Sequence, residues 1–311
     1  MRRLGVLVAL LALAGCGGAS HGRETAAAKR TVPGPLQVAN GPAQAADPGS
    51  RPLTLELTGA ADPIVVAFKR PPRSGLLFDL DTGKVLWRWR PARVLPIASL
   101  TKMMTALVVV QRSKPTDNVR ITKEALAYKG SAVGVLPKGK RVKLETMLNG
   151  LLLPSGNDAA IALAQRMSGT VARFVARMND QARELGLECT RFSSPDGFQD
   201  AGNHSCAIDL ASLARAVLDQ PRLARIVRRR RAVLPFPIKG GRLYLFNNNP
   251  LLRTGYPGAI GIKTGYTDAA GRCLVAAAQR NGRRLGVVLL HSPDPGKQAR
   301  QLLNRGFALR T

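Results

Sequence analysis

The sequence predicts an α/β fold in which an antiparallel sheet is flanked by helices and accompanied by an all-helical lobe. Three observations lead to this prediction. Two strand-like segments lie near residues 76–89, a helix-rich middle extends from residue 101 to about residue 218, and further strands precede a final helix near residues 296–307. We expect an active site between the sheet and the helical lobe.

An apolar helix is predicted to begin at or near Ser99. The run 100–110 is apolar nearly all round, which is typical of a buried central helix. Ser99 and Lys102 are three residues apart and therefore share one helix face. A serine hydroxyl becomes a good nucleophile when a base removes its proton, and a buried, neutral lysine can be that base. The Ser99 amide, at the positive helix end, is a candidate oxyanion-hole donor.

Two predicted helices meet at Ser155-Gly-Asn157. The apolar segment 144–153 is followed by a proline, and a second apolar helix extends over 159–167. We expect Ser155 or Asn157 to cap the second helix. In a catalytic interpretation, Ser155 relays a proton to a leaving amine, and Asn157 holds the substrate and the motif lysine in place.

A third motif, Lys263-Thr-Gly265, precedes a predicted β-hairpin. The strand-like segments 274–279 and 285–290 are joined through Asn281-Gly282, the strongest two-residue hairpin signal. Lys263 is therefore expected on a strand edge that can pair with an extended peptide. Thr264 offers a hydroxyl to a carboxylate, and the adjacent glycine has no side chain to obstruct the peptide.

Together the three motifs resemble those of the low-molecular-mass penicillin-binding proteins, specifically the serine-type D-alanyl-D-alanine carboxypeptidases of the peptidase S11 type. Each motif alone is a weak signal, because a solvated helix turn, a helix cap or an ordinary turn would explain it. Longer blocks are more specific, and the match covers about residues 74–311. These blocks are Leu76-Leu-Phe-Asp-Leu-Asp-Thr-Gly-Lys84, Ala98-Ser-Leu-Thr-Lys-Met-Met-Thr105, Ser155-Gly-Asn-Asp-Ala-Ala160, Pro195-Asp-Gly197 and Gly261-Ile-Lys-Thr-Gly-Tyr-Thr-Asp268.

The resemblance implies a β-lactamase/DD-peptidase-like fold and a hydrolase that trims the terminal D-Ala of peptidoglycan stem peptides through an acyl-enzyme on Ser99. It also implies β-lactams as inhibitors. Carried over by motif, the catalytic residues are Ser99, Lys102, Ser155 and Asn157, and the substrate-binding residues are Lys263, Thr264, Gly265 and Tyr266, with the second oxyanion amide at Tyr266.

One stretch departs from the family pattern. Related carboxypeptidases often carry an arginine in an Asn-Arg-Asn-Gly-Leu-Leu stretch that helps to bind the terminal carboxylate. The corresponding stretch here is Asn247-Asn-Asn-Pro-Leu-Leu252, with Asn248 at the arginine position. Carboxylate recognition is therefore expected to depend more on Thr264, Lys263 and another cation, for which Arg253 is a candidate.

The first residues are similar to a bacterial lipoprotein signal. Met1-Arg-Arg3 precedes an apolar run too short for a stable membrane span, which ends in Leu13-Ala-Gly-Cys16. Two acyl chains on Cys16 would anchor the protein to the bacterial cell membrane on its extracytoplasmic side. An ordinary signal peptide with an incidental cysteine is the alternative. We expect a lipoprotein signal peptide at 1–15, a flexible Ala/Gly/Pro-rich tether at 16–62 with one strand-like run at 53–57, and a DD-peptidase catalytic domain at 63–311.

The chain is strongly basic, with a formal net charge of +28. Nucleic acid is the usual partner of such a protein, but an exported, lipid-anchored enzyme meets none. Anionic wall polymers and lipid headgroups satisfy the same electrostatics. The run Arg228-Arg-Arg-Arg231 is either part of such a surface or a solvated helix end. The histidines at positions 21, 204 and 291 show no metal-ligand spacing, so we expect neither a metal nor a cofactor.

A disulfide between Cys189 and Cys206 is predicted, because export places the domain in an oxidising compartment. The two cysteines flank an irregular stretch, 191–204, that is rich in turn formers and has little to pack. Two separate buried thiols are the alternative. Cys273, at the start of a predicted central strand, is expected to be buried and free.

Three other functions compete with the carboxypeptidase. A β-lactamase needs a carboxylate base to clear its acyl-enzyme, and the usual Glu-x-x-x-Asn arrangement is missing, since neither Glu184 nor Glu188 has the downstream asparagine. A DD-endopeptidase that cuts peptide crosslinks uses the same chemistry. A non-catalytic wall-binding module would need a broken motif, and all three motifs are intact.

Overall fold

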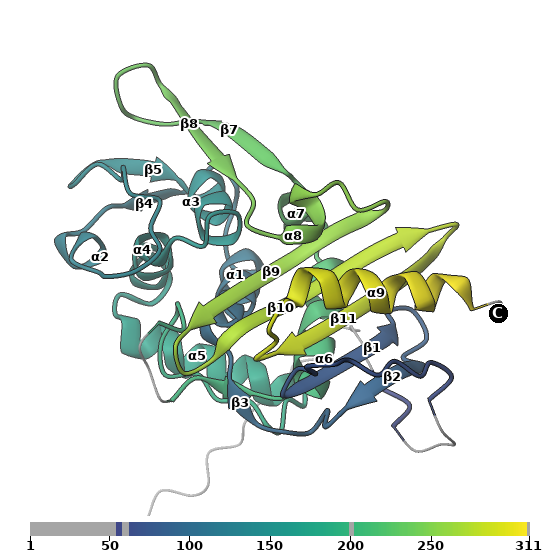
Figure 1. Cartoon of the computed structure of the whole chain (residues 1–311). Coiled ribbons are helices and arrows are strands. Elements are labelled where there is room, and N and C mark those ends of the chain that lie inside the picture. The colour runs from purple at the N-terminus through teal and green to yellow at the C-terminus, as the bar shows by residue number, and fades with distance from the viewer. Residues whose placement is uncertain (1–53, 58–61, 199–201, 310–311) are drawn as a thin grey trace, which may run out of the picture. The chain divides into compact units, whose positions relative to one another are not determined.

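A five-stranded antiparallel sheet organises the residues that the computed structural model describes, which are 54–57, 62–198 and 202–309 (Figure 1). The strand order is β2-β1-β11-β10-β9, so strands from both ends of the chain are neighbours. Every neighbouring pair is antiparallel. The strands are β1 (Ser74–Asp79), β2 (Val85–Trp89), β9 (Ala259–Thr267), β10 (Gly271–Arg280) and β11 (Arg283–Leu290).

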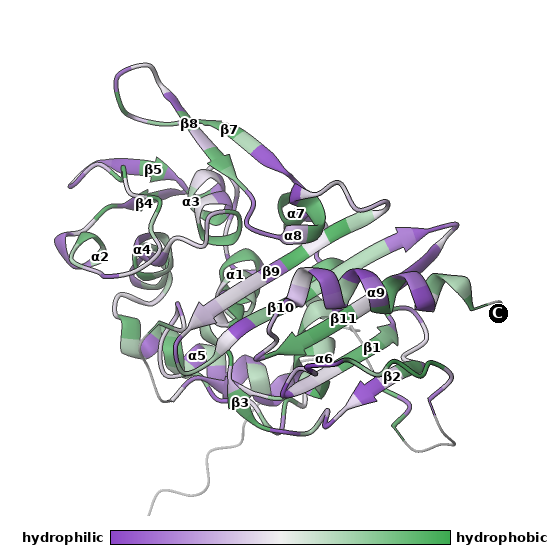
Figure 2. Cartoon of the chain, viewed as in Figure 1, coloured by the Kyte–Doolittle hydropathy of each residue, from purple (hydrophilic) through white to green (hydrophobic). Residues whose placement is uncertain are grey.

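Both faces of the sheet are covered by helices. Helix α9 (Pro295–Ala308) packs on one face, and α6 (Ala207–Asp219) and α7 (Pro221–Val227) pack on the other. Strand residues alternate between the two cores, since Leu274 packs with α9 and Val275 packs with the helical side. Hydrophobic residues therefore run along most of β11, while α9 shows hydrophilic and hydrophobic bands (Figure 2).

A helical lobe is built around α1 (Lys102–Gln111), whose residues 102–109 are all buried. A helix that is apolar all round can be stable only when it is surrounded. Helices on several sides supply that environment, since α1 contacts α3 (Leu144–Leu152), α4 (Asn157–Ser168), α5 (Val171–Glu184), α6 and α7. The short α2 (Lys123–Leu126) packs on α4.

Small two-stranded ribbons and short helices complete the lobe and its connections. The ribbons are β3 (Leu95–Pro96) with β6 (His204–Ser205), β4 (Asn118–Arg120) with β5 (Arg141–Lys143), and β7 (Arg231–Pro235) with β8 (Arg242–Phe246); the helices are η1 (Ala98–Thr101) and α8 (Pro250–Arg253). Helix α8 follows the β7-β8 ribbon and packs on β9.

The predicted fold class and final helix are confirmed, and so is the predicted hairpin. Arg280 pairs with Arg283, so Asn281 and Gly282 form the two-residue turn. Their φ angles are 48° and 79°, as a type I′ turn requires. The segment predicted at 53–57 as a strand forms, within its described part, one isolated bridge from Glu56 to Lys84.

The helix expected at or near Ser99 is confirmed, since it begins with a 3-10 turn, η1, at Ala98 and continues as α1 from Lys102. The predicted capping of α4 by Ser155 or Asn157 is wrong, because Gly156 is the N-cap and no side chain caps the helix. The Asn157 side chain is turned towards another segment, since its nitrogen donates to the Lys129 carbonyl at 3.5 Å.

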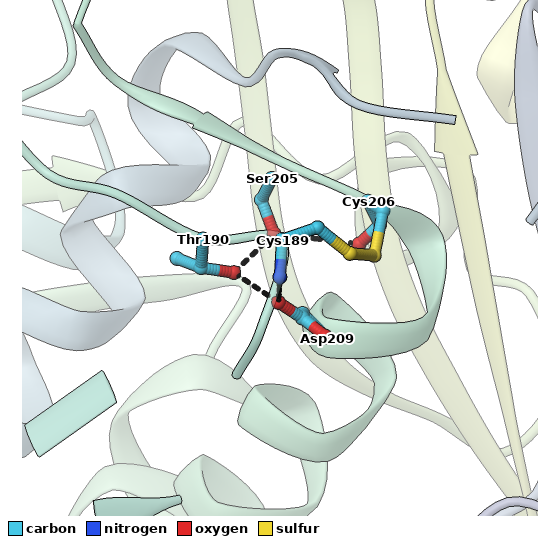
Figure 3. Close-up of a disulfide and its surroundings, with 5 residues drawn as sticks. All are labelled: Cys189, Thr190, Ser205, Cys206 and Asp209. Atoms are coloured by element: carbon cyan, nitrogen blue, oxygen red, sulfur yellow. Dashed lines mark hydrogen bonds between the residues drawn. A yellow bond between two sulfur atoms is a disulfide. The ribbon is translucent and has the colours of Figure 1, made fainter. Parts of the chain in front are cut away.

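The structure joins Cys189 and Cys206 in a disulfide, with their Cα atoms 5.8 Å apart (Figure 3). Asp209 lies beside the bridge and accepts hydrogen bonds from the Cys189 amide at 2.8 Å and from the Thr190 hydroxyl at 2.6 Å (Figure 3). Because the two sulfurs are bonded to each other, this cluster offers no thiolate to a metal ion. Cys273 is buried with a free thiol, as predicted.

The expected signal peptide, the lipidation site Cys16 and most of the tether lie outside the described residues. In the part of the chain that the structure describes, every helix is too short or too polar to span a bilayer.

Candidate active site

Ser99 and Lys102 meet at the junction of η1 and α1. The Lys102 ammonium nitrogen donates a hydrogen bond to Ser99 Oγ at 2.8 Å and a second one to the Asp196 carbonyl, also at 2.8 Å. Lys102 is fully buried, whereas Ser99 keeps part of its surface exposed. The Ser99 hydroxyl, the candidate nucleophile, is thus open to a substrate, and its candidate base, Lys102, is shielded from water.

Burial lowers the pKa of Lys102 to about 7, although the negative charges of Asp196 and Asp158 raise it in part. A lysine in water has a pKa near 10.4 and is almost entirely charged at neutral pH. A lysine with a pKa of about 7 is instead neutral in a large fraction of molecules. Lys102 therefore has the property that a general base for Ser99 needs.

A second buried lysine lies nearby. Burial lowers the pKa of Lys263 well below its usual value, and the positive charge of Lys102 lowers it further. Its ammonium nitrogen donates to the Thr264 carbonyl at 2.9 Å. Neither lysine has a carboxylate within ion-pair distance among the described residues. The positive charge of Lys102 thus adds to burial in keeping the proton affinity of Lys263 low.

The turn between α3 and α4 holds Ser155 in a costly conformation. Ser155 has a φ of 70°, in the left-handed region that non-glycine residues rarely occupy. Its hydroxyl is buried and, like Asn157 Oδ1, has no hydrogen-bond partner in the described part of the chain. The Asn157 amide nitrogen of the backbone donates to the Ser131 carbonyl at 2.9 Å, which fixes the turn. Strain and unpaired buried polar atoms are typical of a site that is completed by its ligand.

Gly265 allows β9 to lie close to Ser99. A side chain at this position would place its Cβ 2.9 Å from the Ile97 carbonyl and 3.1 Å from the Ser99 amide nitrogen. Tyr266 follows on the same strand and borders the same cavity as Ser99. Within the described residues β9 is an edge strand with one unpaired side, so an extended peptide can pair with it.

The block Pro195-Asp-Gly197 helps to hold Lys102, the candidate base, in position. The Asp196 carbonyl accepts the Lys102 hydrogen bond, and the Pro195 carbonyl accepts one from Thr105 at 2.6 Å. Gly197 has a φ of 74°, and a Cβ there would lie 2.0 Å from the Ala98 carbonyl. The sequence showed this block only as part of the family resemblance, and nothing in it pointed to a backbone carbonyl as the partner of Lys102.

One cavity of about 400 Å³ brings five of the predicted site residues together. Lys102, Asn157 and Lys263 are buried behind it. The cavity is lined by Ser99, Ser131, Ser155, Asn248, Pro250, Thr264, Gly265, Tyr266, Arg272, Cys273, Asp294, Pro295 and Gly296.

The cation suggested to replace the family arginine lies elsewhere. Arg253 lines a neighbouring cavity of about 660 Å³, together with Arg230, Arg231 and Asn248. Arg272, which sequence reasoning missed, lines the Ser99 cavity instead. Its only signal in the sequence was its place on the strand next to Lys263-Thr-Gly265.

The family model described as D-alanyl-D-alanine carboxypeptidase, peptidase S11, matches residues 67–294. The chain belongs to this family. It is similar to the D-alanyl-D-alanine carboxypeptidase DacF of Bacillus subtilis, with 34% identity over 235 residues, which are 74% of this chain and 60% of that protein. It is also 36% identical to DacB2 of Mycobacterium tuberculosis over 247 residues, which are 77% of this chain and 83% of that protein.

Solved structures agree with the family assignment. The crystal structure of a Streptomyces DD-transpeptidase superimposes with a TM-score of 0.73 and 32% identity, covering 79% of this chain and all of that one (100%). The fold is therefore that of the DD-peptidases. The chain spans about 60% of the length of DacF.

Proposed function

We propose that this protein is a serine D-alanyl-D-alanine carboxypeptidase that removes the terminal D-Ala of peptidoglycan stem peptides through an acyl-enzyme on Ser99. One observation carries the proposal. Ser99 Oγ is hydrogen-bonded to a fully buried lysine with a pKa of about 7, in a cavity bordered by an edge strand. Family membership supports the choice of D-alanyl-D-alanine peptides as substrates.

In the proposed acylation step, neutral Lys102 takes the proton of Ser99, and Ser99 Oγ bonds to the carbonyl carbon of the penultimate D-Ala. The oxyanion that forms accepts hydrogen bonds from the amides of Ser99 and Tyr266. When the carbon–nitrogen bond breaks, the nitrogen of the leaving D-Ala receives a proton through the Ser155 hydroxyl, and Lys102 supplies that proton. Water then cleaves the serine ester, releasing the shortened peptide and restoring Ser99.

The test uses a fluorescent penicillin and a pentapeptide that ends in D-Ala-D-Ala. The purified protein should become labelled covalently and should release D-Ala, and Ser99→Ala should do neither. Ser131→Ala is the matched control, because Ser131 lines the same cavity but, of the serine hydroxyls in the described lining, only that of Ser99 accepts a lysine hydrogen bond. Persistent labelling of Ser99→Ala, with unchanged thermal stability, would refute the assignment of the nucleophile.

A β-lactamase is the less favoured alternative. Hydrolysis of a penicilloyl ester requires a carboxylate positioned to activate water. Asp294 is the one carboxylate among the described residues that line the cavity, and it accepts a hydrogen bond from the Lys297 amide at 3.0 Å as the N-cap of α9. We therefore expect the lifetime of the penicilloyl-enzyme to be much longer than the time that the protein needs to turn over one peptide. An endopeptidase activity is tested by offering a crosslinked dimer of stem peptides in the same assay.

We also propose export and lipid anchoring through Cys16, with residues 1–15 removed and residues 16–62 as the tether of the domain at 63–311. The similarity of Leu13-Ala-Gly-Cys16 to a lipoprotein signal supports this proposal. Mass spectrometry of the membrane fraction should find a mature N-terminus at a lipid-modified Cys16, and Cys16→Ser should release the protein or leave the signal uncleaved. A mature form that begins elsewhere and carries no lipid contradicts it.

Anionic wall polymers are the proposed additional partners. The net charge of +28 and the cavity that contains Arg230, Arg231 and Arg253 support this proposal. Binding of the purified protein to a poly(glycerol phosphate) should weaken strongly between low and high salt. Binding that is absent at low salt would contradict the proposal.

A further inference from the structure

Arg272 is the one lysine or arginine among the described residues that line the Ser99 cavity. We infer that Arg272 is the residue that recognises a free carboxylate at the end of the substrate, in place of the arginine that the family often carries at the position of Asn248. This inference rests on the proposed function, since it assigns a specificity residue to the same site.

The sheet register places Arg272 beside Thr264. Arg272 pairs with Tyr266 and Leu274 pairs with Thr264, across β10 and β9. Residues two apart on a strand share a face, and so do directly paired residues, so Arg272 and Thr264 lie diagonally on one face. Diagonal neighbours are about 7–8 Å apart, a gap that a long side chain or a carboxylate between them can bridge.

The face of the sheet that carries Thr264 and Arg272 is the one on which α9 packs. Leu274 packs in the core under α9, whereas Lys263 pairs with Val275, which packs with the helical lobe. Thr264 and Arg272 therefore lie on the α9 face of the sheet and line the cavity, whereas Lys263 lies on the opposite face, towards the helical lobe. A carboxylate bound between Thr264 and Arg272 would lie on the side of the cavity that Pro295 and Gly296 close.

The Arg272 guanidinium is held in place but retains free donors. Its Nη1 donates to the Pro293 carbonyl at 2.9 Å, just before α9. An arginine has five N–H donors in a fork that matches a carboxylate. Arg272 is exposed, and it forms none of the ion pairs found among the described residues. Its charge and most of its donors are thus available to a ligand.

The other candidates near the cavity are less suitable. Asn248 is neutral, and its side-chain nitrogen donates to the Pro154 carbonyl at 3.1 Å. Arg253 lines the neighbouring cavity, together with Arg230 and Arg231. Asp294 places a negative charge near the proposed subsite, but it caps α9 and makes no ion pair with Arg272 within the described residues. Among the described residues that line the cavity, Arg272 is therefore the one cation that an anion at this subsite can contact.

The experiment compares two peptides that differ only at the end, one with D-Ala-D-Ala as the free acid and one with the same sequence as the C-terminal amide. For the parent protein, kcat/KM should be higher for the acid. Arg272→Gln should lower kcat/KM for the acid by about 10-fold to 100-fold, as expected for the loss of a hydrogen-bonded charge, and should change the value for the amide little. Arg272→Lys should restore part of the preference, because it keeps the charge but not the fork.

Arg253→Gln is the matched control, because it removes the same charge from the neighbouring cavity and should leave the acid-to-amide ratio unchanged. If Arg272→Gln leaves the ratio unchanged, the inference is overturned. If only Arg253→Gln abolishes the preference for the acid over the amide, the carboxylate binds in the neighbouring cavity lined by Arg253. The inference is then also overturned. Thermal stability of each variant shows whether it is folded.

A binding measurement separates this inference from the proposed function. Fluorescent versions of the acid and the amide are titrated onto Ser99→Ala, with and without Arg272→Gln. The Ser99→Ala protein should bind the acid more tightly, and Arg272→Gln should remove that difference even if the parent protein proves unable to turn over either peptide. Equal affinity of Ser99→Ala for acid and amide would overturn the role of Arg272, whatever the outcome of the labelling assay.

Discussion

Replacing Lys102 with methionine should stabilise the protein at acidic to neutral pH while it abolishes acylation. The folded protein lowers the pKa of Lys102 from 10.5 to about 7, mainly through burial. At about 1.4 kcal/mol per pH unit, that difference corresponds to about 5 kcal/mol of destabilisation. Methionine has a similar length and no charge, so it avoids this cost.

Two hydrogen bonds are lost in the same variant. Lys102 bonds to Ser99 Oγ and to the Asp196 carbonyl. Their loss, including the unpaired carbonyl, costs about 2–3 kcal/mol. At about pH 6 the Lys102→Met protein should therefore be more stable than its parent by about 2 kcal/mol.

The sign of this difference depends on pH. Below the folded pKa of about 7, Lys102 is charged in both the folded and unfolded states, and the burial cost is fully present. The cost disappears as pH rises towards the unfolded pKa of 10.5, because the unfolded state then also loses the proton. At about pH 10 only about 1 kcal/mol of the cost remains, so Lys102→Met should be the less stable protein by about 2 kcal/mol.

Urea denaturation at several pH values, followed by circular dichroism, measures both free energies of unfolding. The exposed residue Lys138 supplies the matched control, since Lys138→Met should leave the difference from the parent small and nearly independent of pH. If the free energies of unfolding of Lys102→Met and the parent differ by the same amount at acidic and at alkaline pH, burial does not lower the proton affinity of Lys102. The argument for its role as a base would then lose its support.

Three further predictions follow from the site and its supports. The rate of penicillin acylation should rise with pH through about 7, because only neutral Lys102 can accept the Ser99 proton; a stopped-flow profile that stays flat across that range would contradict this. Gly197→Ala should lower the free energy of unfolding by at least about 2 kcal/mol and slow acylation, because its Cβ would lie 2.0 Å from the Ala98 carbonyl, and urea denaturation with a labelling time course tests both effects. Cys206→Ser should lower the free energy of unfolding by about 3 kcal/mol, since the disulfide closes a loop with a sequence separation of 17; a loss below about 1 kcal/mol would show that the bridge contributes little.

Local patterns were enough to predict the elements that frame the site. The apolar run after Ser99 indicated a buried helix, and Asn281-Gly282 indicated the hairpin that joins β10 to β11. The contact between Ser99 and Lys102 was predictable for the same reason, because both residues lie within one helical turn. Such predictions depend on chain geometry over a few residues, which the order of the residues determines almost alone.

Local patterns failed where a distant segment competed for a local role. Ser155 and Asn157 have the side chains that usually cap a helix, yet Gly156 is the N-cap of α4. Asn157 is instead tied to the loop between α2 and β5, where its backbone N–H donates to the Ser131 carbonyl and its side-chain nitrogen donates to the Lys129 carbonyl. Capping propensity is worth only about 1 kcal/mol, so contacts with another segment readily override it.

The order of the residues was enough to identify the candidate reacting groups, namely a serine, two lysines and a glycine expected on a strand edge, in three motifs. The chemical properties of these groups depend on contacts between distant segments. Lys102 has a pKa of about 7 because segments far apart in the chain exclude water from it, and its second partner, the Asp196 carbonyl, is 94 residues away. Arg272 likewise reaches the cavity only because β10 pairs with β9 in one register. Burial and register are sums over many distant contacts, and no short pattern of residues contains them.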